Sequence, residues 1–148
     1  MKNPVHKLKN AWFDKLNGNL TYDSIQVPVY REDAGKLPSS HYVLIRAAGS
    51  RNERTADSFM RWVSLFIQII TKFHGTENVD DSIVESIEEQ ITELILPTTL
   101  DDSLVDTDFQ ITLVSNESDN YENFIDTDQS IKYFIKTTTW EHLAVQKL

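Results

Sequence analysis

Carboxylates are the residues of this sequence whose types and spacing come nearest to a chemical site. The second half of the chain holds three closely spaced pairs: Asp101 with Asp102, Asp106 with Asp108, and Asp126 with Asp128. Carboxylate oxygens are hard ligands that suit Mg²⁺ or Ca²⁺. An EF-hand loop is excluded, because Ile111 and Ile131 occupy the sixth position, where that loop needs glycine. A metal-dependent enzyme stays open as one hypothesis, beside chance spacing in an acidic chain.

Other catalytic residue types show no supporting pattern. The four histidines share no ligand spacing with each other or with a carboxylate, so we expect ordinary surface or partly buried residues. With four glycines and no Gly-x-Ser-x-Gly string, the sequence has neither a phosphate-binding loop nor a nucleophile elbow. The absence of cysteine excludes a disulfide scaffold, a thiol nucleophile and a zinc site with sulfur ligands. We therefore predict no catalytic, metal-binding or cofactor-binding residue and no cofactor.

Charge is distributed unevenly along the chain, whose net charge is −9. Residues 1–72 hold eleven bases and six acids, residues 73–131 hold sixteen acids and no base, and residues 132–148 hold three bases and one acid. The acidic interval also contains regularly spaced isoleucines, so we expect it to fold. It is either a solvated face or one side of an electrostatically polar surface that attracts a basic neighbour.

Four arginines gather around a polar loop at residues 49–58: Arg46, Arg51, Arg54 and Arg61. One interpretation is an exposed hairpin tip. The other is a docking arm, because a basic loop and an acidic second half suit a head-to-tail contact between copies. The acidic net charge and the lack of repeated aromatic and basic interleaving argue against sequence-specific nucleic-acid binding.

The elements that must position these residues follow from hydrophobic spacing. The length of 148 residues and an apolar fraction of 40% predict one soluble domain, with no signal peptide or membrane span. Apolar spacings of three and four predict helices, and β-branched runs predict strands. The segment 59–73 fits both patterns, but its β-branched and aromatic residues favour a buried strand. We predict helices at residues 5–16 and 78–96, and strands at residues 25–30, 42–48, 59–73, 109–114 and 131–140.

This order predicts an α+β domain, with a mainly antiparallel sheet of about five strands and two helices on one face. Pro28 places the first strand at a sheet edge or a strand start. The polar stretch 115–130 is expected to be an extended hairpin connection or a loop.

Three local strings resemble the tail terminator and tail completion family of tailed bacteriophages, in the same order of elements. They are Val-Pro-Val-Tyr at residues 27–30, Tyr-Val-Leu-Ile-Arg at residues 42–46, and Trp-Val-Ser-Leu-Phe-Ile-Gln-Ile-Ile at residues 62–70. The resemblance covers nearly the whole chain. It implies a non-enzymatic virion protein, assembled in the bacterial host cytoplasm, that forms a ring at the head-to-tail junction or the tail end. The implied ring has six copies, with twelve as an alternative.

The resemblance also implies roles for the charged residues. The implied partners are neighbouring neck, portal-adaptor or tail-tube proteins, and DNA passes through the ring without sequence-specific contacts. A carboxylate-rich lumen would repel phosphates and let DNA slide past. The subunit-interface candidates are Arg51, Asn52, Arg54 and Arg61. The pore-lining candidates are Asp101, Asp102, Asp106, Asp108, Glu117, Asp119, Glu122, Asp126 and Asp128.

A second class of function stays open: a small cellular adaptor domain whose acidic half binds a basic protein partner.

Overall fold

The computed structural model describes residues 3–32, 41–52, 60–96, 104–126 and 130–147. The first helix, α1 (Pro4–Leu16), begins where the Asn3 side chain accepts a hydrogen bond of 3.0 Å from the Val5 amide. Proline at the first helical position costs no hydrogen bond. The chain leaves the helix through Gly18, whose φ of +81° favours glycine. The predicted helix at residues 5–16 is confirmed.

The second helix, α2 (Ser82–Ile95), begins four residues later than predicted. The Asp80 carboxylate accepts a hydrogen bond of 2.9 Å from the Ser82 amide, which makes a local turn before the helix. One stripe of α2 is buried: Ile83, Ile87, Ile91 and Ile95. Neither described helix is long and apolar enough to cross a membrane.

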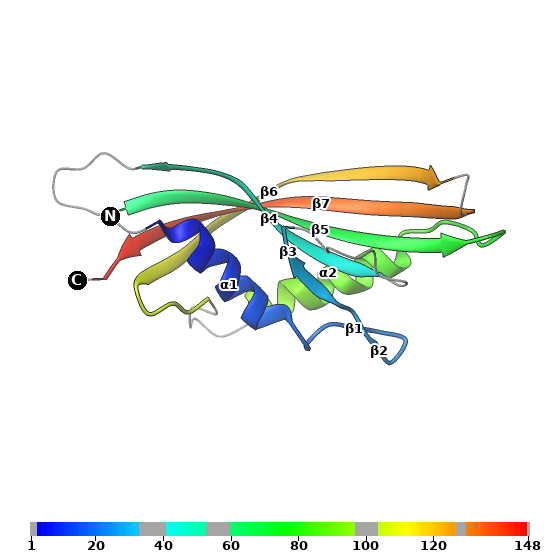
Figure 1. Ribbon diagram of the computed structural model, residues 1–148, viewed down its shortest axis with the longest axis horizontal. Helices are drawn as coiled ribbons and strands as arrows, with labels where there is room; N and C mark the ends of the chain where they lie inside the picture. Colours follow the sequence, from blue (N-terminus) through cyan, green and yellow to red (C-terminus); the bar gives the residue numbers. More distant parts are fainter. Residues whose placement is uncertain (1–2, 33–40, 53–59, 97–103, 127–129, 148) are drawn as a thin grey trace.

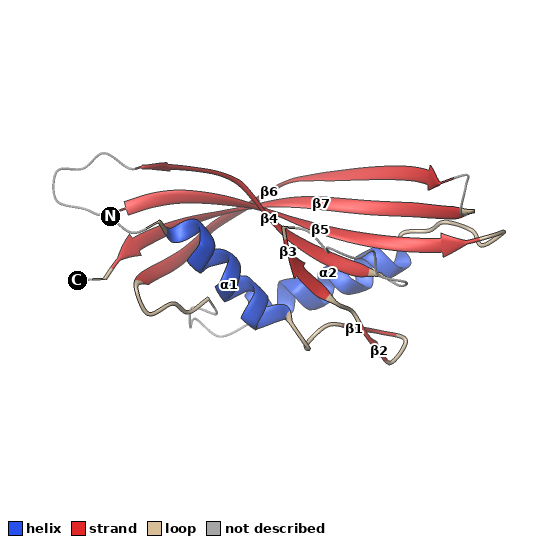
Figure 2. Ribbon diagram, viewed as in Figure 1, coloured by secondary structure: helices blue, strands red, loops and turns tan. Residues whose placement is uncertain are grey.

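Five strands form the main sheet, in the order β3-β4-β5-β7-β6 (Figures 1 and 2). Their bounds are β3 (Val29–Arg31), β4 (Tyr42–Asn52), β5 (Met60–His74), β6 (Phe109–Asp126) and β7 (Ile131–Gln146). All neighbours are antiparallel except β3 and β4, which are parallel. A separate ribbon joins β1 (Thr21–Tyr22) to β2 (Ile25–Gln26). The predicted α+β class and mainly antiparallel sheet are confirmed.

The ambiguous segment 59–73 is a strand, β5, in the middle of the sheet. Its side chains at Val63, Leu65, Ile67 and Ile69 point to the core beneath the helices. On its other face, Ile70 packs in a second cluster with Tyr42 and Leu44. The second face of β5 is therefore covered only in part, by the side chains around Ile70, and Phe66 on that face is 38% exposed. The short strand β3 follows Pro28 at the sheet edge, as predicted.

The polar stretch 115–130 differs from its prediction, because β6 continues as a strand to Asp126. It pairs with β7 in register from Asp119 opposite Thr138 to Asp126 opposite Ile131. Two irregularities, between Leu113 and Ser115 and between Glu117 and Asp119, interrupt the ladder. Residues 120–125 are exposed, and a strand whose side chains are exposed needs no apolar alternation, so its sequence resembled a loop. The predicted loop 49–58 begins as strand to Asn52, and residues 53–59 lie outside the described part.

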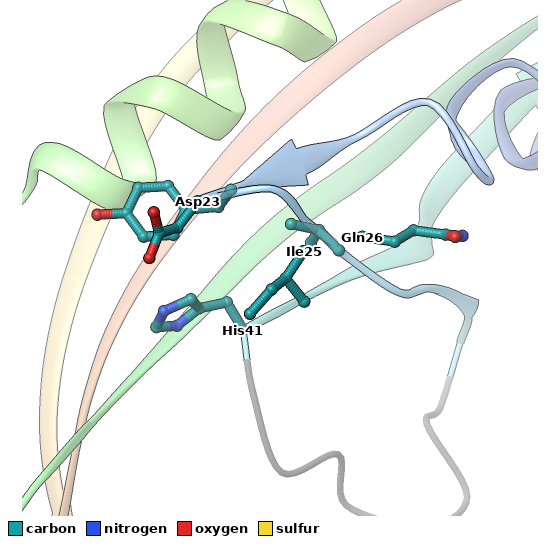
Figure 3. Close-up of a pocket in the computed structure, with 6 residues that line it drawn as sticks. Asp23, Ile25, Gln26 and His41 are labelled. Carbon is teal, nitrogen blue, oxygen red and sulfur yellow. The ribbon is translucent and has the colours of Figure 1, made fainter.

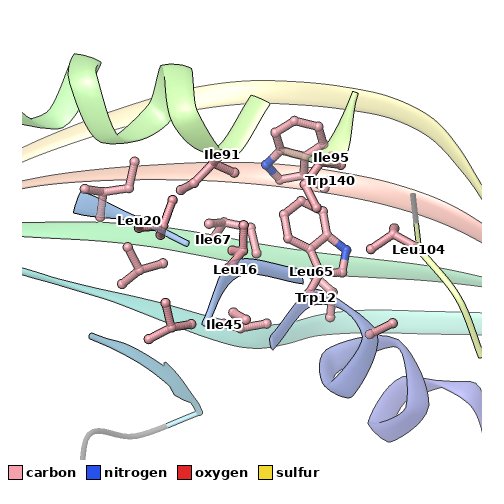
Figure 4. Close-up of a cluster of buried hydrophobic side chains, with 14 of the residues drawn as sticks. Trp12, Leu16, Leu20, Ile45, Leu65, Ile67, Ile91, Ile95, Leu104 and Trp140 are labelled. Atoms are coloured by element: carbon pink, nitrogen blue, oxygen red, sulfur yellow. The ribbon is translucent and has the colours of Figure 1, made fainter. Parts of the chain in front are cut away.

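The core lies between the sheet and the two helices (Figure 4). Trp12 of α1 and Trp140 of β7 meet edge to face with ring centroids 5.2 Å apart. Leu65 and Ile67 of β5 and Ile91 of α2 complete the contact between layers. The opposite face of the sheet carries no described helix. We call it the helix-free face.

Candidate functional site

Two of the predicted pore-lining acids stabilise the start of β6. The Asp106 carboxylate accepts hydrogen bonds from the amides of Asp108, at 2.8 Å, and Phe109, at 3.1 Å. The Asp108 carboxylate lies 3.4 Å from the Lys7 ammonium of α1. Both acids therefore have partners within the subunit, beside the N-terminal turns of α1.

Two further acids lie at the other end of the same strand. Glu122 is opposite Ile135 and Asp126 is opposite Ile131 in the β6–β7 ladder. Asp126 borders the helix-free face, and Glu122 is exposed. Because a strand rises about 3.3 Å per residue, roughly 45 Å of strand separates Asp108 from Glu122. One subunit therefore does not bring these acids together.

The remaining acidic candidates are described less fully. The backbone of β6 places Glu117 opposite Thr139 and Asp119 opposite Thr138. Three acids lie outside the described residues: Asp101, Asp102 and Asp128.

The structure brings three of the four interface candidates to one end of the sheet. Arg51 is opposite Trp62, and Asn52 is opposite Arg61, in the β4–β5 ladder. The Nε atom of Arg61 is buried without a hydrogen-bond partner among the described residues. Arg54, the fourth candidate, lies outside the described part of the chain. The distal end of the β4–β5 hairpin is therefore basic, as its sequence indicated.

The order of the strands places basic and acidic residues at opposite edges of the sheet, an arrangement that the sequence did not reveal. The strands at one edge, β3 and β4, contain Arg31, Arg46 and Arg51 and no acid. The strand at the opposite edge, β6, contains four acids and no base. The two edges of one sheet thus carry opposite formal charge. The division of charge along the chain had indicated two regions, but not that they form opposite edges.

Four glutamates of α2 form a further acidic surface that was absent from the predicted pore-lining set. Glu85, Glu88, Glu89 and Glu93, together with Thr92, line an open depression of about 390 Å³. Lys136 of β7 is buried beneath this helix, with its ammonium in contact with the Glu88 carboxylate and 3.4 Å from that of Glu85. The helical stripe of isoleucines predicted which face of α2 turns outward, so these glutamates were recognisable from the sequence.

An open hollow with a volume of about 420 Å³ lies on the helix-free face. Its lining is mostly aromatic and aliphatic, with one charged residue from β4 and one from β6. The lining residues are Tyr42, Leu44, Arg46, Gln68, Ile70, Phe124, Asp126, Tyr133 and Ile135. The Arg46 guanidinium is held to the backbone, since its Nε donates a hydrogen bond of 2.9 Å to the Glu32 carbonyl. The lining has the composition of a contact surface rather than a catalytic centre.

A smaller hollow of about 180 Å³ lies beside the β1–β2 turn (Figure 3). Asp23, Ile25 and His41 line it. His41 Nδ1 accepts a hydrogen bond of 3.1 Å from the Lys72 amide, and burial lowers the pKa of this imidazole. Among the residues that the structure describes, no group of three His, Asp or Glu side chains is placed to hold a metal ion.

The most perturbed histidine, His142, lies in the core instead of in a hollow. Its Nε2 accepts a hydrogen bond of 2.9 Å from the Trp12 indole, and its Nδ1 lies 3.2 Å from the Val63 carbonyl. Burial lowers the pKa of His142 to about 4, so the imidazole is neutral near pH 7. It connects α1, β5 and β7 and has no access to a substrate.

Comparisons with known proteins identify the fold. No protein-family model matches the chain, and no curated protein matches its sequence. A chain in the virion of a native gene transfer agent particle shares the fold with a TM-score of 0.56 and 12% identity, over 95% of both chains. A sheath/tube terminator of an extracellular contractile injection system gives a TM-score of 0.43 and 11% identity, over 100% of this chain and 58% of the other. The chain therefore has the fold of a known virion component, in line with the family that its sequence resembles.

Proposed function

We propose that this protein is a structural virion subunit that forms a closed ring at the head-to-tail junction or at the end of a tail. The fold shared with a gene transfer agent virion chain over 95% of both chains carries this proposal. The order of elements and the three strings that resemble tail terminators support it independently. The ring has six copies, or twelve in the alternative arrangement.

The basic end of the β4–β5 hairpin supplies one side of the contact between subunits. Arg51, Asn52 and Arg61 lie on paired strands there, and Arg54 belongs to the connection between those strands. The buried Arg61 Nε lacks a hydrogen bond among the described residues, and a neighbouring copy would offer one. The acidic surface of the next subunit is the complementary partner.

The acids line a conduit through which DNA passes without sequence-specific binding. Of the predicted set, Glu122 is exposed, whereas Asp106 and Asp108 have partners inside the subunit. The glutamates of α2 join the pore-lining candidates, because they form an acidic surface in the described structure. A one-signed lumen repels the phosphate backbone. Neck, portal-adaptor or tail-tube proteins stack above and below the ring.

Native mass spectrometry and electron microscopy of the purified protein test this function. A discrete closed oligomer with a central hole is the expected result, and Arg51→Glu with Arg54→Glu should abolish it. A chain that stays monomeric over a wide concentration range contradicts the ring and favours the acidic adaptor domain. A ring whose carboxylates lie on its outer wall contradicts the conduit alone.

A further inference from the structure

In the part of the chain that the structure describes, two stretches of strand leave a sheet edge without a neighbouring strand. Strand β3 pairs with β4 only as far as Ile45, and the Glu32 side chain accepts a hydrogen bond of 3.0 Å from the Ala47 amide just beyond. Among the described residues, no strand lies beside residues 48–52. On the other side, β6 is the outermost strand of the described sheet. We call residues 48–52 the β4 edge and residues 119–126 the β6 edge.

The two edges lie diagonally across the molecule. The β4 edge is at the left end of the twisted sheet in Figure 1, and the β6 edge is at the right end. The β6 edge follows the second irregularity, so its ladder with β7 is regular from Asp119 to Asp126. A regular strand with open backbone groups is a template for pairing with another chain.

Exposed apolar side chains gather at the β6 edge. Tyr121 is 47% exposed, Phe124 is 59% exposed and Ile125 is 62% exposed. Side chains alternate along this regular stretch, so Tyr121, whose hydroxyl donates a hydrogen bond to Glu85 of α2, and Ile125 lie on one face, and Phe124 lies on the helix-free face. Exposed apolar side chains therefore flank the edge on both faces of the sheet. Near the β4 edge, Phe66 of β5 is 38% exposed and lies opposite Arg46. The β6 edge therefore offers apolar surface beside its backbone groups, whereas near the β4 edge the exposed apolar side chain belongs to the neighbouring strand β5.

Charge distinguishes between the possible pairings of these edges. The β6 edge contains Asp119, Glu122 and Asp126, whereas β4 contains Arg46 and Arg51. Two β6 edges side by side would place carboxylates against carboxylates, and two β4 edges would place arginines together. Like charges directly opposite one another destabilise a strand pair. Pairing of a β6 edge with a β4 edge is the arrangement in which opposite charges meet.

We propose that the β6 edge of one copy adds as a strand to the β4 edge of the next copy, so that the sheets of neighbouring subunits are continuous. This inference rests on the proposed ring and identifies its contact. Backbone hydrogen bonds supply affinity, and the opposite charges select the partner edge. Because the contact joins two different surfaces, each copy keeps one open edge until the ring closes.

Two variants with matched charge changes test this contact. Ser50→Glu with Arg51→Glu lowers the formal charge of the β4 edge by three, and Glu122→Lys with Asn123→Lys raises that of the β6 edge by three. Each variant alone should lose ring assembly, with an association constant at least about tenfold lower. An equimolar mixture should assemble again, because the unmodified edges of the two variants still carry opposite charges and the new glutamates can face the new lysines.

A control variant and the possible contrary outcomes distinguish a wrong edge contact from a wrong ring proposal. Asp14→Lys with Asn17→Lys raises the formal charge by three at exposed positions at the end of α1, outside both edges, and should leave the ring intact. Circular dichroism establishes that each variant is folded. The edge contact is wrong if either edge variant still forms rings. It is also wrong if the folded variants stay monomeric when mixed while the unmodified chain forms rings. Neither outcome contradicts the ring itself. An unmodified chain that stays monomeric overturns both.

A cross-link tests the same contact if an edge variant fails to fold. The chain has no cysteine, so Ser50→Cys with Asn123→Cys introduces one thiol at each edge. Oxidation of the assembled protein should give a covalent ladder that ends at the ring number. Ser50→Cys with Asp14→Cys, which places the second thiol at an exposed position of α1, is the matched control and should give no ladder. Equal cross-linked ladders from the two double-cysteine variants contradict the proposal. So does the absence of a ladder from Ser50→Cys with Asn123→Cys.

Discussion

The hairpin of β6 and β7 has two ends with opposite properties. At the end beside α1, Phe109 and Trp140 are 1% exposed and His142 is fully buried. At the other end, Phe124 and Ile125 of the same strand β6 are more than half exposed. One pair of strands therefore holds part of the core at one end and an open surface at the other.

The difference follows from the length and twist of the strands. Strand β7 has 16 residues and β6 has 18, whereas α1 has 13 residues and covers only part of their length. A helix rises about 1.5 Å per residue and a strand about 3.3 Å, so a helix of similar residue number spans less than half the strand. The end beyond α1 is covered partly by α2, through Lys136 and its glutamates. Stability and surface chemistry are thereby separated along one hairpin.

Trp140→Ala should have the largest effect on the free energy of unfolding. Its ring is 1% exposed and meets Trp12 edge to face, and its Nε1 donates a hydrogen bond of 2.8 Å to Thr138 Oγ1. Truncation of a large buried aromatic side chain costs about 3–5 kcal/mol. Urea denaturation monitored by circular dichroism measures this loss. A loss below about 1 kcal/mol would show that the end beside α1 does not dominate stability.

Protonation of His142 should make the free energy of unfolding depend on pH, with an effect slightly smaller than that of Trp140→Ala. The unfolded chain protonates this histidine near its ordinary pKa of 6.5, whereas the folded chain resists protonation until about pH 4. The unfolded state therefore binds more protons between these values, and the free energy of unfolding falls as pH decreases from about 6.5 to about 4. At about 1.36 kcal/mol per pKa unit, the loss from this residue is about 2–4 kcal/mol.

His142→Gln isolates this contribution by removing the titrating group and keeping an acceptor for the Trp12 indole. The variant should lose most of the slope between pH 6.5 and pH 4 in denaturation measured at each pH. His41→Gln is the control, because burial lowers the pKa of His41 at a site farther from the core, and most of the slope should remain. Equal slopes in the unmodified chain and in His142→Gln would contradict the assignment.

The parts of the fold with strong hydrophobic periodicity could be predicted from the sequence. The helix at residues 5–16 and the buried strand at residues 59–73 follow from apolar spacing and β-branched content. The strand at residues 115–126 could not be predicted, because its sequence shows no apolar alternation, and residues 120–125 are exposed. Its pairing depends on β7, which is a long-range contact that local sequence does not encode.

The candidate site was predictable only in its charges. The sequence showed a basic loop and an acidic second half, but strand order decides that these become opposite edges of one sheet. The separation of Asp108 from Glu122 along β6 depends on the same extension of the strand. His142 gave no signal either, because its burial results from contacts with Trp12 and Val63, which are distant in sequence.

Phe124→Ala should have the smallest effect on stability and separate the two ends most directly. Phe124 contacts Tyr133, with ring centroids 5.8 Å apart, but it is 59% exposed, so truncation should cost less than about 1 kcal/mol. Phe109→Ala is the matched control on the same strand, since its ring is 1% exposed and truncation should cost about 3–5 kcal/mol. If the β6 edge contacts the next copy, Phe124→Ala should weaken assembly measured by sedimentation while the urea midpoint hardly changes. Equal losses of stability in the two variants would mean that the hairpin is one cooperative core, and that its exposed end is not reserved for a partner.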